Sequence, residues 1–296
     1  MHPPPVRARA GTLYVLATPI GNLRDITLRA LDILGSVDLV AAEDTRTTAG
    51  LLAAYGIEAR LFAYHEHNER SATPVLLERL RSGASIALAS DAGTPGISDP
   101  GTLLVAAARA EGIPVEPIPG PNAAVAALSA CGLDAPHWLF YGFLPAKSSA
   151  RRKVLETLRD LPHTLVFYEA PHRIGECVAD LADILGGTRR ACIARELTKR
   201  FETLHRCTLA EACPWLAADE NHRRGEFVLL VGGAVPAAYD ELAAARPVLA
   251  ALLDELPASQ AARLAARITG VRKNLLYQAA LEQAGDKHDE SPHDQT

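Results

Sequence analysis

The sequence has few of the features that mark secreted, membrane-spanning or zinc-binding proteins. Its five cysteines are scattered and include no Cys-x-x-Cys pair, so they predict neither a disulfide framework nor a zinc knuckle. No segment approaches the roughly 20 apolar residues that span a bilayer. The first ten residues also lack the apolar core of a signal peptide. We therefore expect a cytoplasmic protein without a membrane partner.

The chain also lacks an excess of positive charge. Its 30 Lys and Arg residues stand against 35 Asp and Glu, for a net charge of −5, which argues against a uniformly basic nucleic-acid binder. The cations nevertheless gather within residues 147–153, 199–200, 223–224 and 263–273. Each cluster can bind phosphate locally, or can simply be the solvated face of a helix.

Several catalytic and nucleotide-binding motifs are missing. Neither GxGxxG nor GxxxxGK[ST] occurs, so no dinucleotide or P-loop site is indicated, and no GxSxG elbow supports a serine hydrolase. His65-Glu66-His67 resembles a metal site, but no third ligand follows at a suitable spacing. We expect no metal ion.

What the chain does have is a regular alternation of apolar strand-like runs with segments of helical period. With 296 residues and 48% hydrophobic composition it can form two α/β domains, the second with a mixed sheet. Gly132, Asp134 and Pro136 interrupt the pattern between them. The predicted organisation is a disordered tail (1–10), an N-terminal α/β domain (11–131), a C-terminal α/β domain (137–234), a helical domain (240–284) and a second disordered tail (285–296).

The helical domain carries an amphipathic face formed by Leu249, Leu252, Leu253 and Leu256. Ser259 is placed to cap a following helix, and the turn at 269–270 leads into a third one over 271–283. Two helices joined by a glycine-containing turn are typical of a helix-turn-helix-like unit. Because cations gather around this turn within residues 263–273, we expect the unit to bind RNA. A clasp for dimerisation explains the same pattern equally well.

Three Gly/Pro-rich loops each follow a predicted strand, over residues 18–23, 90–101 and 119–124. In open α/β sheets ligands bind at the carboxyl ends of the strands. Glycine permits close approach of backbone to ligand, and Asn122 either caps the next helix or binds the ligand. These loops predict a site for a small, partly polar molecule.

An ordered series of segments resembles the tetrapyrrole-methylase superfamily of S-adenosylmethionine-dependent methyltransferases, and its RNA-modifying branch in particular. The segments are LYVLATPIGNLRDITLRAL, AAEDTRTT, SDAGTPGISDPG, PIPGPNAA, YGFLPAK, FYEAPHR, ARELTKRFE and GEFVLLV, within residues 11–233, and GVRKNLLY in the tail. A long ordered series is much more specific than one loop.

The resemblance implies two α/β domains of the tetrapyrrole-methylase type, with S-adenosylmethionine in the cleft between them, and a homodimer. It also implies 2′-O-methylation of a decoding-site cytidine in the 16S rRNA of the small ribosomal subunit. The family's usual Gly-Pro-Gly-Asp loop is replaced here by Thr-Pro-Ile-Gly-Asn. The implied cofactor contacts are Pro19, Asp91, Ala92, Gly93, Ile97, Asn122, Ala123, Glu169 and Leu197.

Methyl transfer to a hydroxyl gains from alignment of the reactants and from a base that removes the proton. The candidate catalytic carboxylates are Glu43, Asp44, Glu169 and Glu196. Their alternative role is structural, as helix caps or as ion-pair partners of nearby Arg46, Arg173 or Lys199. The candidate RNA-binding residues are Arg46, Lys147, Arg151, Arg152, His172, Arg173, Lys199, Arg272 and Lys273.

Two other functions fit the same residues. The acceptor could be a tetrapyrrole or a modified protein side chain of the diphthine type. Alternatively, the protein could be a non-catalytic RNA-binding assembly factor that retains the cofactor pocket. The helical tail and the basic segment 147–153 favour an RNA methyltransferase.

Overall fold

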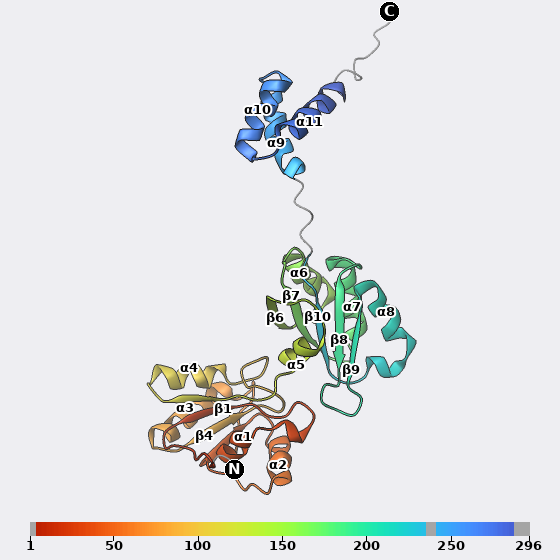
Figure 1. Ribbon diagram of the computed structural model, residues 1–296. Coiled ribbons are helices and arrows are strands. Elements are labelled where there is room, and N and C mark those ends of the chain that lie inside the picture. The colour runs from red at the N-terminus through yellow and green to blue at the C-terminus, as the bar shows by residue number, and fades with distance from the viewer. Residues whose placement is uncertain (1–3, 235–240, 287–296) are drawn as a thin grey trace, which may run out of the picture. The chain divides into compact units, whose positions relative to one another are not determined.

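A computed structural model describes residues 4–234 and 241–286 (Figure 1). The chain divides into two compact units, one ending at Ala234 and the other lying beyond it. The first unit contains two β-sheets and the second contains helices only, among the described residues.

The first sheet of the larger unit is entirely parallel. Its five strands lie in the order β3-β2-β4-β1-β5. The central strands are short apolar runs that are buried along their whole length, as parallel strands covered on both faces must be. The strands are β1 (Leu13–Leu16), β2 (Leu39–Ala42), β3 (Leu61–Ala63), β4 (Ile86–Ala89) and β5 (Val115–Ile118).

Alternate side chains of this sheet enter two separate cores. Leu39 and Leu88 pack with α3 (Glu69–Arg81) and α4 (Thr102–Ala110) on one face. Val40 and Ala89 pack with α1 (Leu28–Leu34) and α2 (Thr45–Ala54) on the other. Because helices cover both faces, only the sheet edges and the loops at the strand ends are free to bind a ligand.

The second sheet is mixed, as the sequence predicted. Its order is β6-β7-β10-β8-β9, with a parallel β6–β7 pair and antiparallel pairs elsewhere. The strands are β6 (Trp138–Phe143), β7 (Thr164–Glu169), β8 (Arg190–Arg195), β9 (Thr203–Thr208) and β10 (Phe227–Val231). The register between β6 and β7 shifts between Phe140 and Gly142.

Helices also cover both faces of the second sheet. One of these helices directly follows the last strand of the first sheet in the chain. On one face lie α6 (Ser148–Leu158), α7 (Ile174–Leu185) and α8 (Leu209–Ala218). On the other lies α5 (Ala123–Ala130), which follows the loop after β5. Ile20 from the loop after β1 joins that second core. The loops at the strand ends of the first sheet are thereby packed against the second sheet.

Two short 3-10 helices complete the larger unit, over Leu23–Asp25 and Glu220–Arg223. The smaller unit consists of α9 (Glu241–Leu253), α10 (Ala258–Thr269) and α11 (Lys273–Asp286). Leu249, Ala265 and Leu276 from these three helices share one core, and Gly270 ends α10 in a left-handed conformation. The predicted fold, two α/β halves followed by a small helical domain, is confirmed.

Some local predictions differ from the structure. The short strand β3 was not predicted, and α10 begins after Pro257 without a side-chain cap, so Ser259 is not its N-cap. The N-terminal tail was expected to be disordered, yet the backbone N–H groups of Val6 and Ala8 donate to Asp32 and Ser36. The predicted C-terminal tail lies outside the described residues from position 287 on.

Candidate functional site

A pocket of about 330 Å³ lies where the strand-end loops of the first sheet meet the second sheet, and we call it the central pocket. Its volume is within the range of sites for small ligands, and its wall is mostly apolar. The lining residues are Ile20, Ala92, Gly93, Thr94, Ile97, Ser98, Asp99, Asn122, Ala123, Phe143, Tyr168, Glu169, Ala170, Pro171, Leu197, Glu226, Phe227 and Val228.

The loop after β4 forms one wall and is tied to the loop after β1. Thr18 and Gly93 exchange both backbone hydrogen bonds, at N···O distances of 2.8 and 3.0 Å. Gly93 has a φ of +87°, which side-chain-bearing residues rarely adopt. The glycine therefore lets this loop turn back on Thr18 and present its backbone to the pocket.

The N-terminus of α5 forms the next part of the wall. The Asn122 side chain accepts a hydrogen bond from the backbone N–H of Val125 and so caps the helix. The N–H of Ala124 donates to the Tyr168 hydroxyl at 3.3 Å. Asn122 and Tyr168 line the same pocket, so the first helix turn and the second sheet are joined there.

Leu197 projects into the pocket from a strained loop between β8 and β9. Its neighbours Glu196 and Thr198 have φ angles of +52° and +66°, which cost free energy in residues other than glycine. The Glu196 carboxylate accepts from Lys199 Nζ at 2.9 Å and from the Glu226 backbone N–H at 3.0 Å. Although partial burial alone would raise the pKa of Glu196, these partners hold it below its usual value.

Glu169 lies at the end of β7, and its side chain is fully buried. Its carboxylate accepts from Arg173 at 3.2 Å and from the Ala170 backbone N–H at 2.8 Å. Arg173 also donates to the Leu144 carbonyl oxygen at 2.6 Å. The charge of Glu169 is thus neutralised locally while its residue lines the pocket.

Most of the predicted cofactor-binding residues lie on this wall. Ala92, Gly93, Ile97, Asn122, Ala123, Glu169 and Leu197 line the central pocket, whereas Pro19 and Asp91 do not. Ile20 takes the place expected of Pro19. Sequence reasoning did not name the wall residues of the second sheet, Phe143, Tyr168, Phe227 and Val228. Asp99 was recognised from the sequence as a carboxylate of the loop over residues 90–101, but it was not assigned to the cofactor site.

Of the predicted catalytic carboxylates, Asp44 has a structural role. It caps α2 by accepting from the Arg46 N–H, and its side chain also accepts from the Arg46 guanidinium at 3.1 and 2.6 Å. These hydrogen bonds lower the pKa of Asp44 to about 2. Asp44 therefore has the structural role that the sequence offered as the alternative to catalysis: it caps a helix and pairs with Arg46.

Glu43 and Asp91 connect the ends of β2 and β4. The Asp91 N–H donates to Glu43 at 3.1 Å, and the Asp44 N–H donates to Asp91 at 3.0 Å. Partial burial raises the pKa of Asp91. Neither Glu43 nor Asp91 lines the central pocket, so both shape the rim of the site.

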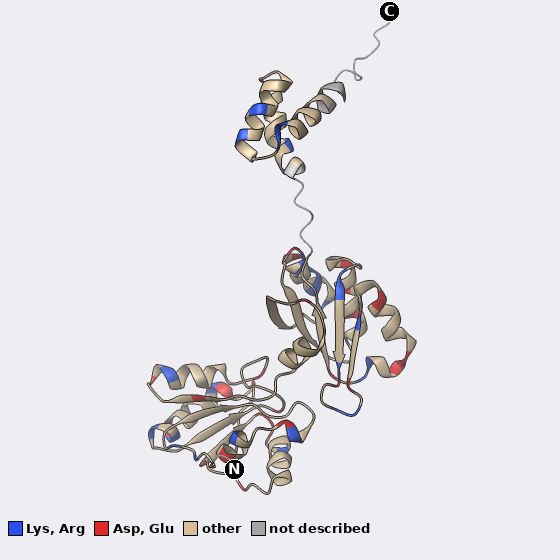
Figure 2. Ribbon diagram, viewed as in Figure 1, with Lys and Arg blue, Asp and Glu red and all other residues tan. Residues whose placement is uncertain are grey.

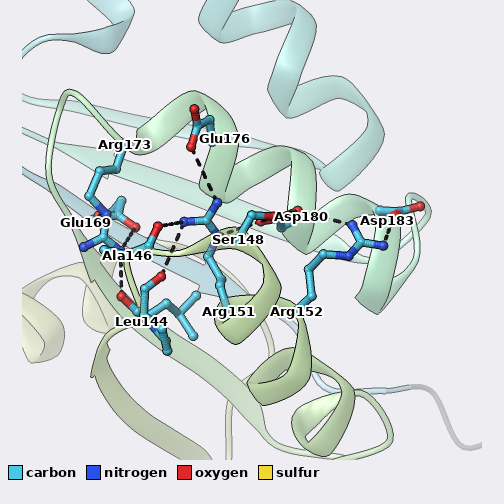
Figure 3. A network of polar contacts seen from close by, with 11 residues as sticks. Leu144, Ala146, Ser148, Arg151, Arg152, Glu169, Arg173, Glu176, Asp180 and Asp183 are labelled. Atoms are coloured by element: carbon cyan, nitrogen blue, oxygen red, sulfur yellow. Dashed lines mark hydrogen bonds and ion pairs between the residues drawn. The ribbon is translucent and has the colours of Figure 1, made fainter.

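The predicted RNA contact by Arg151 is wrong for this structure, because the side chain has no exposed surface. Arg151 donates to Asp180 at 2.7 Å and to the carbonyl oxygen of Ala146 at 3.2 Å, which joins α6 to α7 and to the preceding loop (Figure 3). Its neighbour Arg152 is 38% exposed and pairs with Asp180 and Asp183. Arg151 positions this loop from the interior.

The other predicted RNA-binding residues differ in their solvent exposure and in whether a carboxylate already pairs with them. Lys147 and His172 are exposed, and Arg46 is 90% exposed although it pairs with Asp44. Arg173 and Lys199 are engaged by the carboxylates described above. Arg272 and Lys273 are exposed in the smaller unit, where the described residues 256–281 carry four basic and no acidic side chains (Figure 2).

The described residues contain neither a cluster of metal ligands nor a membrane-spanning helix. His65 and His67 meet edge to face with ring centroids 6.0 Å apart, but no group of three metal-ligating side chains forms within residues 4–234 and 241–286. No helix in the part of the chain that the structure describes combines the length and apolarity needed to cross a membrane.

Comparison with known proteins places these features in a family. Residues 12–213 match the tetrapyrrole (corrin/porphyrin) methylases. The chain belongs to this family. Residues 240–284 match a second family, the RsmI C-terminal HTH domain.

Curated relatives within the methylase family are similar over nearly their whole length. The chain is 55% identical to ribosomal RNA small subunit methyltransferase I of Pseudomonas aeruginosa, over 93% of this chain and 99% of the relative. It is 52% identical to the protein of the same name from Escherichia coli O157:H7, over 93% of this chain and 96% of that one.

Solved structures of other family members share the fold at low identity. Uroporphyrin-III C-methyltransferase of Thermus thermophilus matches with a TM-score of 0.54 and 21% identity, over 75% of this chain and 94% of that one. A structure of that enzyme complexed with S-adenosylhomocysteine matches with a TM-score of 0.54 and 18% identity, over 75% of this chain and 97% of that chain. These matches support the two-sheet architecture.

Proposed function

We propose that this protein is an S-adenosylmethionine-dependent methyltransferase that methylates the ribose 2′-hydroxyl of a decoding-site cytidine in 16S rRNA. The observation that carries the proposal is the 55% identity, over 93% of the chain, to a relative named as a small-subunit rRNA methyltransferase. The central pocket, lined by three strand-end loops of the first sheet and by residues of the second sheet, is the proposed site.

The residues of the pocket fit S-adenosylmethionine. The wall combines apolar side chains with the exposed backbone of the Gly93 loop, which suits a ligand with both apolar and polar parts. Ala92, Gly93, Ile97, Asn122, Ala123 and Leu197 would hold it, with Glu169 as the buried carboxylate of the wall. When bound, the cofactor supplies an electrophilic methyl group on a positively charged sulfur.

The protein's part in the reaction is to align the acceptor, exclude water and accept a proton. Fixing two reactants in a productive geometry accounts for several kcal/mol of barrier reduction in enzymes, up to about 7–11. The strained loop around Leu197 and the paired loops at Thr18 and Gly93 give the pocket a fixed shape. Of the predicted catalytic carboxylates, Asp44, Glu169 and Glu196 are held by cations, and each serves first to position its loop.

The small ribosomal subunit is the proposed partner, which would place the enzyme in the cytoplasm. We propose that the exposed cations of the α10–α11 region contribute phosphate contacts, with Arg46, Lys147 and His172 as further candidates on the larger unit. A homodimer is part of the same proposal. The exposed aromatic side chains of the edge strand β6, Trp138, Tyr141 and Phe143, offer an apolar surface for a second copy.

The test is methyl transfer from radiolabelled S-adenosylmethionine to 30S subunits, naked 16S rRNA and a porphyrinoid. Transfer to rRNA is expected, with one phosphodiester becoming resistant to alkaline cleavage because a methylated 2′-oxygen cannot attack its phosphate. A methyl group found on a nucleobase, or on the porphyrinoid alone, would contradict the proposed acceptor. Cofactor binding without any transfer would favour the non-catalytic assembly factor.

A further inference from the structure

Two segments that each carry a pair of cations are joined beside the central pocket. They are the loop between β8 and β9, residues 196–202, and the segment before β10, residues 220–226 (Figure 2). Lys199 Nζ donates to Glu196 at 2.9 Å and to Glu226 at 2.7 Å, and the Glu226 N–H donates to Glu196 at 3.0 Å. Each segment also supplies a wall residue of the central pocket. We call the two segments together the basic rim.

The first segment of the basic rim carries an exposed aromatic side chain. Phe201 is 63% exposed, although burial of an aromatic ring is favourable. The Arg200 guanidinium lies over this ring, 5.5 Å from its centroid. No ion pair involves Arg200 within residues 4–234 and 241–286. The loop therefore presents an aromatic ring together with a cation that no carboxylate neutralises.

The loop that carries Phe201 is held in a fixed shape. The Thr198 N–H donates to the Glu202 carboxylate at 2.6 Å, and the Glu202 N–H donates to the Lys199 carbonyl oxygen at 3.1 Å. Phe201 follows the pocket residue Leu197 by four positions, which a chain spans in at most about 14 Å. The ring is thus within reach of nucleotides that flank an acceptor bound in the pocket.

The second segment contributes cations to a cavity of about 420 Å³, which we call the outer cavity. Pro171 lines both the outer cavity and the central pocket, so the two adjoin. His172, Arg223 and Arg224 line the outer cavity and are exposed. In the part of the chain that the structure describes, no ion pair involves Arg223. These side chains are available to bind phosphate groups.

Two acidic residues, Glu176 and Glu220, also line the outer cavity, but each already faces an arginine. The Glu176 carboxylate lies 3.8 Å from Arg151, and the Glu220 carboxylate lies 3.7 Å from Arg224. Both glutamate side chains are 80% exposed. Because exposed pairs of this kind are weak, the two carboxylates can turn toward solvent when an anion binds.

An aromatic ring among cations is the combination by which proteins bind single-stranded nucleic acids. Unpaired bases stack on Phe and Arg side chains, while exposed cations contact the phosphates. A nucleotide whose ribose enters the pocket is drawn away from its neighbours in the strand, which leaves a base face without a stacking partner. The Phe201 ring is placed to cover such a face.

We propose that the basic rim and the outer cavity bind the unpaired RNA nucleotides beside the acceptor. Phe201 and Arg200 hold a nucleobase by stacking, and the three cations of the outer cavity bind phosphates of the same strand. This assignment rests on the proposed function. It identifies the RNA at the site as a single strand, and it gives a binding role to residues outside the cofactor pocket.

The test measures RNA binding by variants of the full-length protein. The probes are a fluorescein-labelled single-stranded RNA dodecamer and the corresponding RNA duplex, and fluorescence anisotropy gives their affinities over a range of salt concentrations. The variants are Phe201→Leu, Phe201→Tyr and the double variant Arg223→Gln, Arg224→Gln. Arg109→Gln is the control, because Arg109 is an exposed cation at the far end of α4. The helical domain is the same in every variant, so differences between them report on the basic rim and the outer cavity.

Phe201→Leu is expected to lower affinity for the single strand about fivefold or more, since leucine keeps the apolar bulk but has no ring on which a base stacks. Phe201→Tyr should stay within about twofold of wild type. Affinity for the duplex should change little in either variant, because duplex bases are already stacked. The double arginine variant should lower the salt slope for the single strand by about 1.4, at about 0.7 for each phosphate contact. Arg109→Gln should leave affinity and slope unchanged.

Two binding results would overturn the assignment. One is equal single-strand affinity in Phe201→Leu and Phe201→Tyr, and the other is a salt slope in the double arginine variant equal to that of Arg109→Gln. Two further measurements on Phe201→Leu exclude other roles of the ring. A loss of S-adenosylhomocysteine affinity by calorimetry would make it a support for Leu197, and conversion of a dimer to monomers in sedimentation would make it a contact with a second copy. Either result would also overturn the assignment.

The proposed function fails in a different way. A wild-type protein that binds the single strand through Phe201 but does not methylate 30S subunits contradicts the proposed function alone. A wild-type protein that methylates them, with RNA affinity insensitive to all these variants, contradicts only the role of the basic rim and the outer cavity. A wild-type protein that binds neither RNA probe contradicts that role as well.

Discussion

At the scale of single residues, Gly225 shows how the shape of the pocket depends on a contact behind its wall. Gly225 has a φ of +91°, and a Cβ added there would overlap the Glu196 carboxyl group. Glu196 is the residue that anchors the strained turn carrying Leu197 into the pocket. A methyl group at position 225 would therefore displace Leu197 indirectly, because it would first push Glu196 out of place.

We expect Gly225→Ala to weaken S-adenosylhomocysteine binding about tenfold or more and to destabilise the fold by about 1–3 kcal/mol. Gly56→Ala is the matched control, since Gly56 has a φ of +65° and no atom within 4 Å of an added Cβ. The control should lose stability but keep its affinity. Calorimetry and thermal unfolding measure the two effects, and equal affinities in both variants would show that Glu196 does not position Leu197.

Asp99 also predicts a pH dependence of stability. Because burial raises its pKa in the folded state, the native protein binds more protons than the unfolded chain between about pH 4 and 7. The contribution of this group is therefore present at low pH and is lost as the pH rises through its folded pKa. Above pH 7 the folded protein carries a poorly solvated charge.

We accordingly expect Asp99→Asn to unfold at a higher temperature than wild type at pH 8, with the difference shrinking toward pH 5. Thermal unfolding of both proteins across this range tests the sign. A variant that is less stable than wild type at pH 8 would mean that the Asp99 charge stabilises the fold, contrary to its partly buried, anion-rich surroundings.

At the scale of secondary structure elements, two arginines link helices to the pocket wall: Arg151 of α6, which is buried, and Arg173 at the start of α7, which is partly buried. Arg151 and Arg173 together hold the carbonyl oxygens of Leu144 and Ala146 (Figure 3). This loop directly follows Phe143, which lines the central pocket. The packing of α6 and α7 thereby fixes a wall residue on β6.

Replacement of Arg151 by methionine should cost about 3 kcal/mol of unfolding free energy, because it leaves the Asp180 carboxylate without its buried partner. Arg152→Met is the control from the same helix, and should cost no more than about 1 kcal/mol, since that side chain is 38% exposed. Chemical denaturation measures both. Equal costs would indicate that Arg152 and Ser148 satisfy Asp180 without Arg151.

The elements also show how far the sequence predicts this fold. Apolar runs such as 86–89 predicted β4 because a strand covered on both faces must be apolar throughout. The three-residue strand β3 has no such signal, since its side chains are only partly buried and it exists by pairing with β2. Helix ends were less predictable, as the start of α10 after Pro257 shows.

Some residues of the candidate site were likewise predictable from the sequence, and others were not. Loops at the carboxyl ends of parallel strands share one sheet edge, so Gly93 and Asn122 were predictable as neighbours. The contributions of Phe143 and Tyr168 depend on how the second sheet packs against those loops, which no local pattern encodes. The burial of Arg151 was likewise hidden, because its sequence neighbourhood is rich in exposed cations.

At the scale of the whole molecule, each unit has its own hydrophobic core. The four core clusters of the larger unit contain no residue beyond Val231, and the cluster of the smaller unit contains none before Ala245. All the residues of the central pocket precede position 229. Removal of residues 235–296 should therefore leave S-adenosylhomocysteine affinity within about threefold of the full-length protein, which calorimetry measures.

The same truncation should weaken binding of 16S rRNA and reduce its salt dependence. The α10–α11 region offers Arg263, Arg267, Arg272 and Lys273 without a carboxylate between residues 256 and 281. If all four contact phosphates, their loss lowers the slope of log affinity against log salt by about 3.

In the full-length protein, a double Arg272→Gln, Lys273→Gln variant should lower the slope by about half as much as the truncation does. Arg246→Gln on α9 should change the slope little. Sedimentation of the truncated protein distinguishes RNA binding from dimerisation as the role of the helical domain. If the domain is a dimerisation clasp, the truncated protein should be a monomer. If the truncated protein is a dimer whose RNA affinity and salt slope are unchanged, the RNA-binding role is excluded.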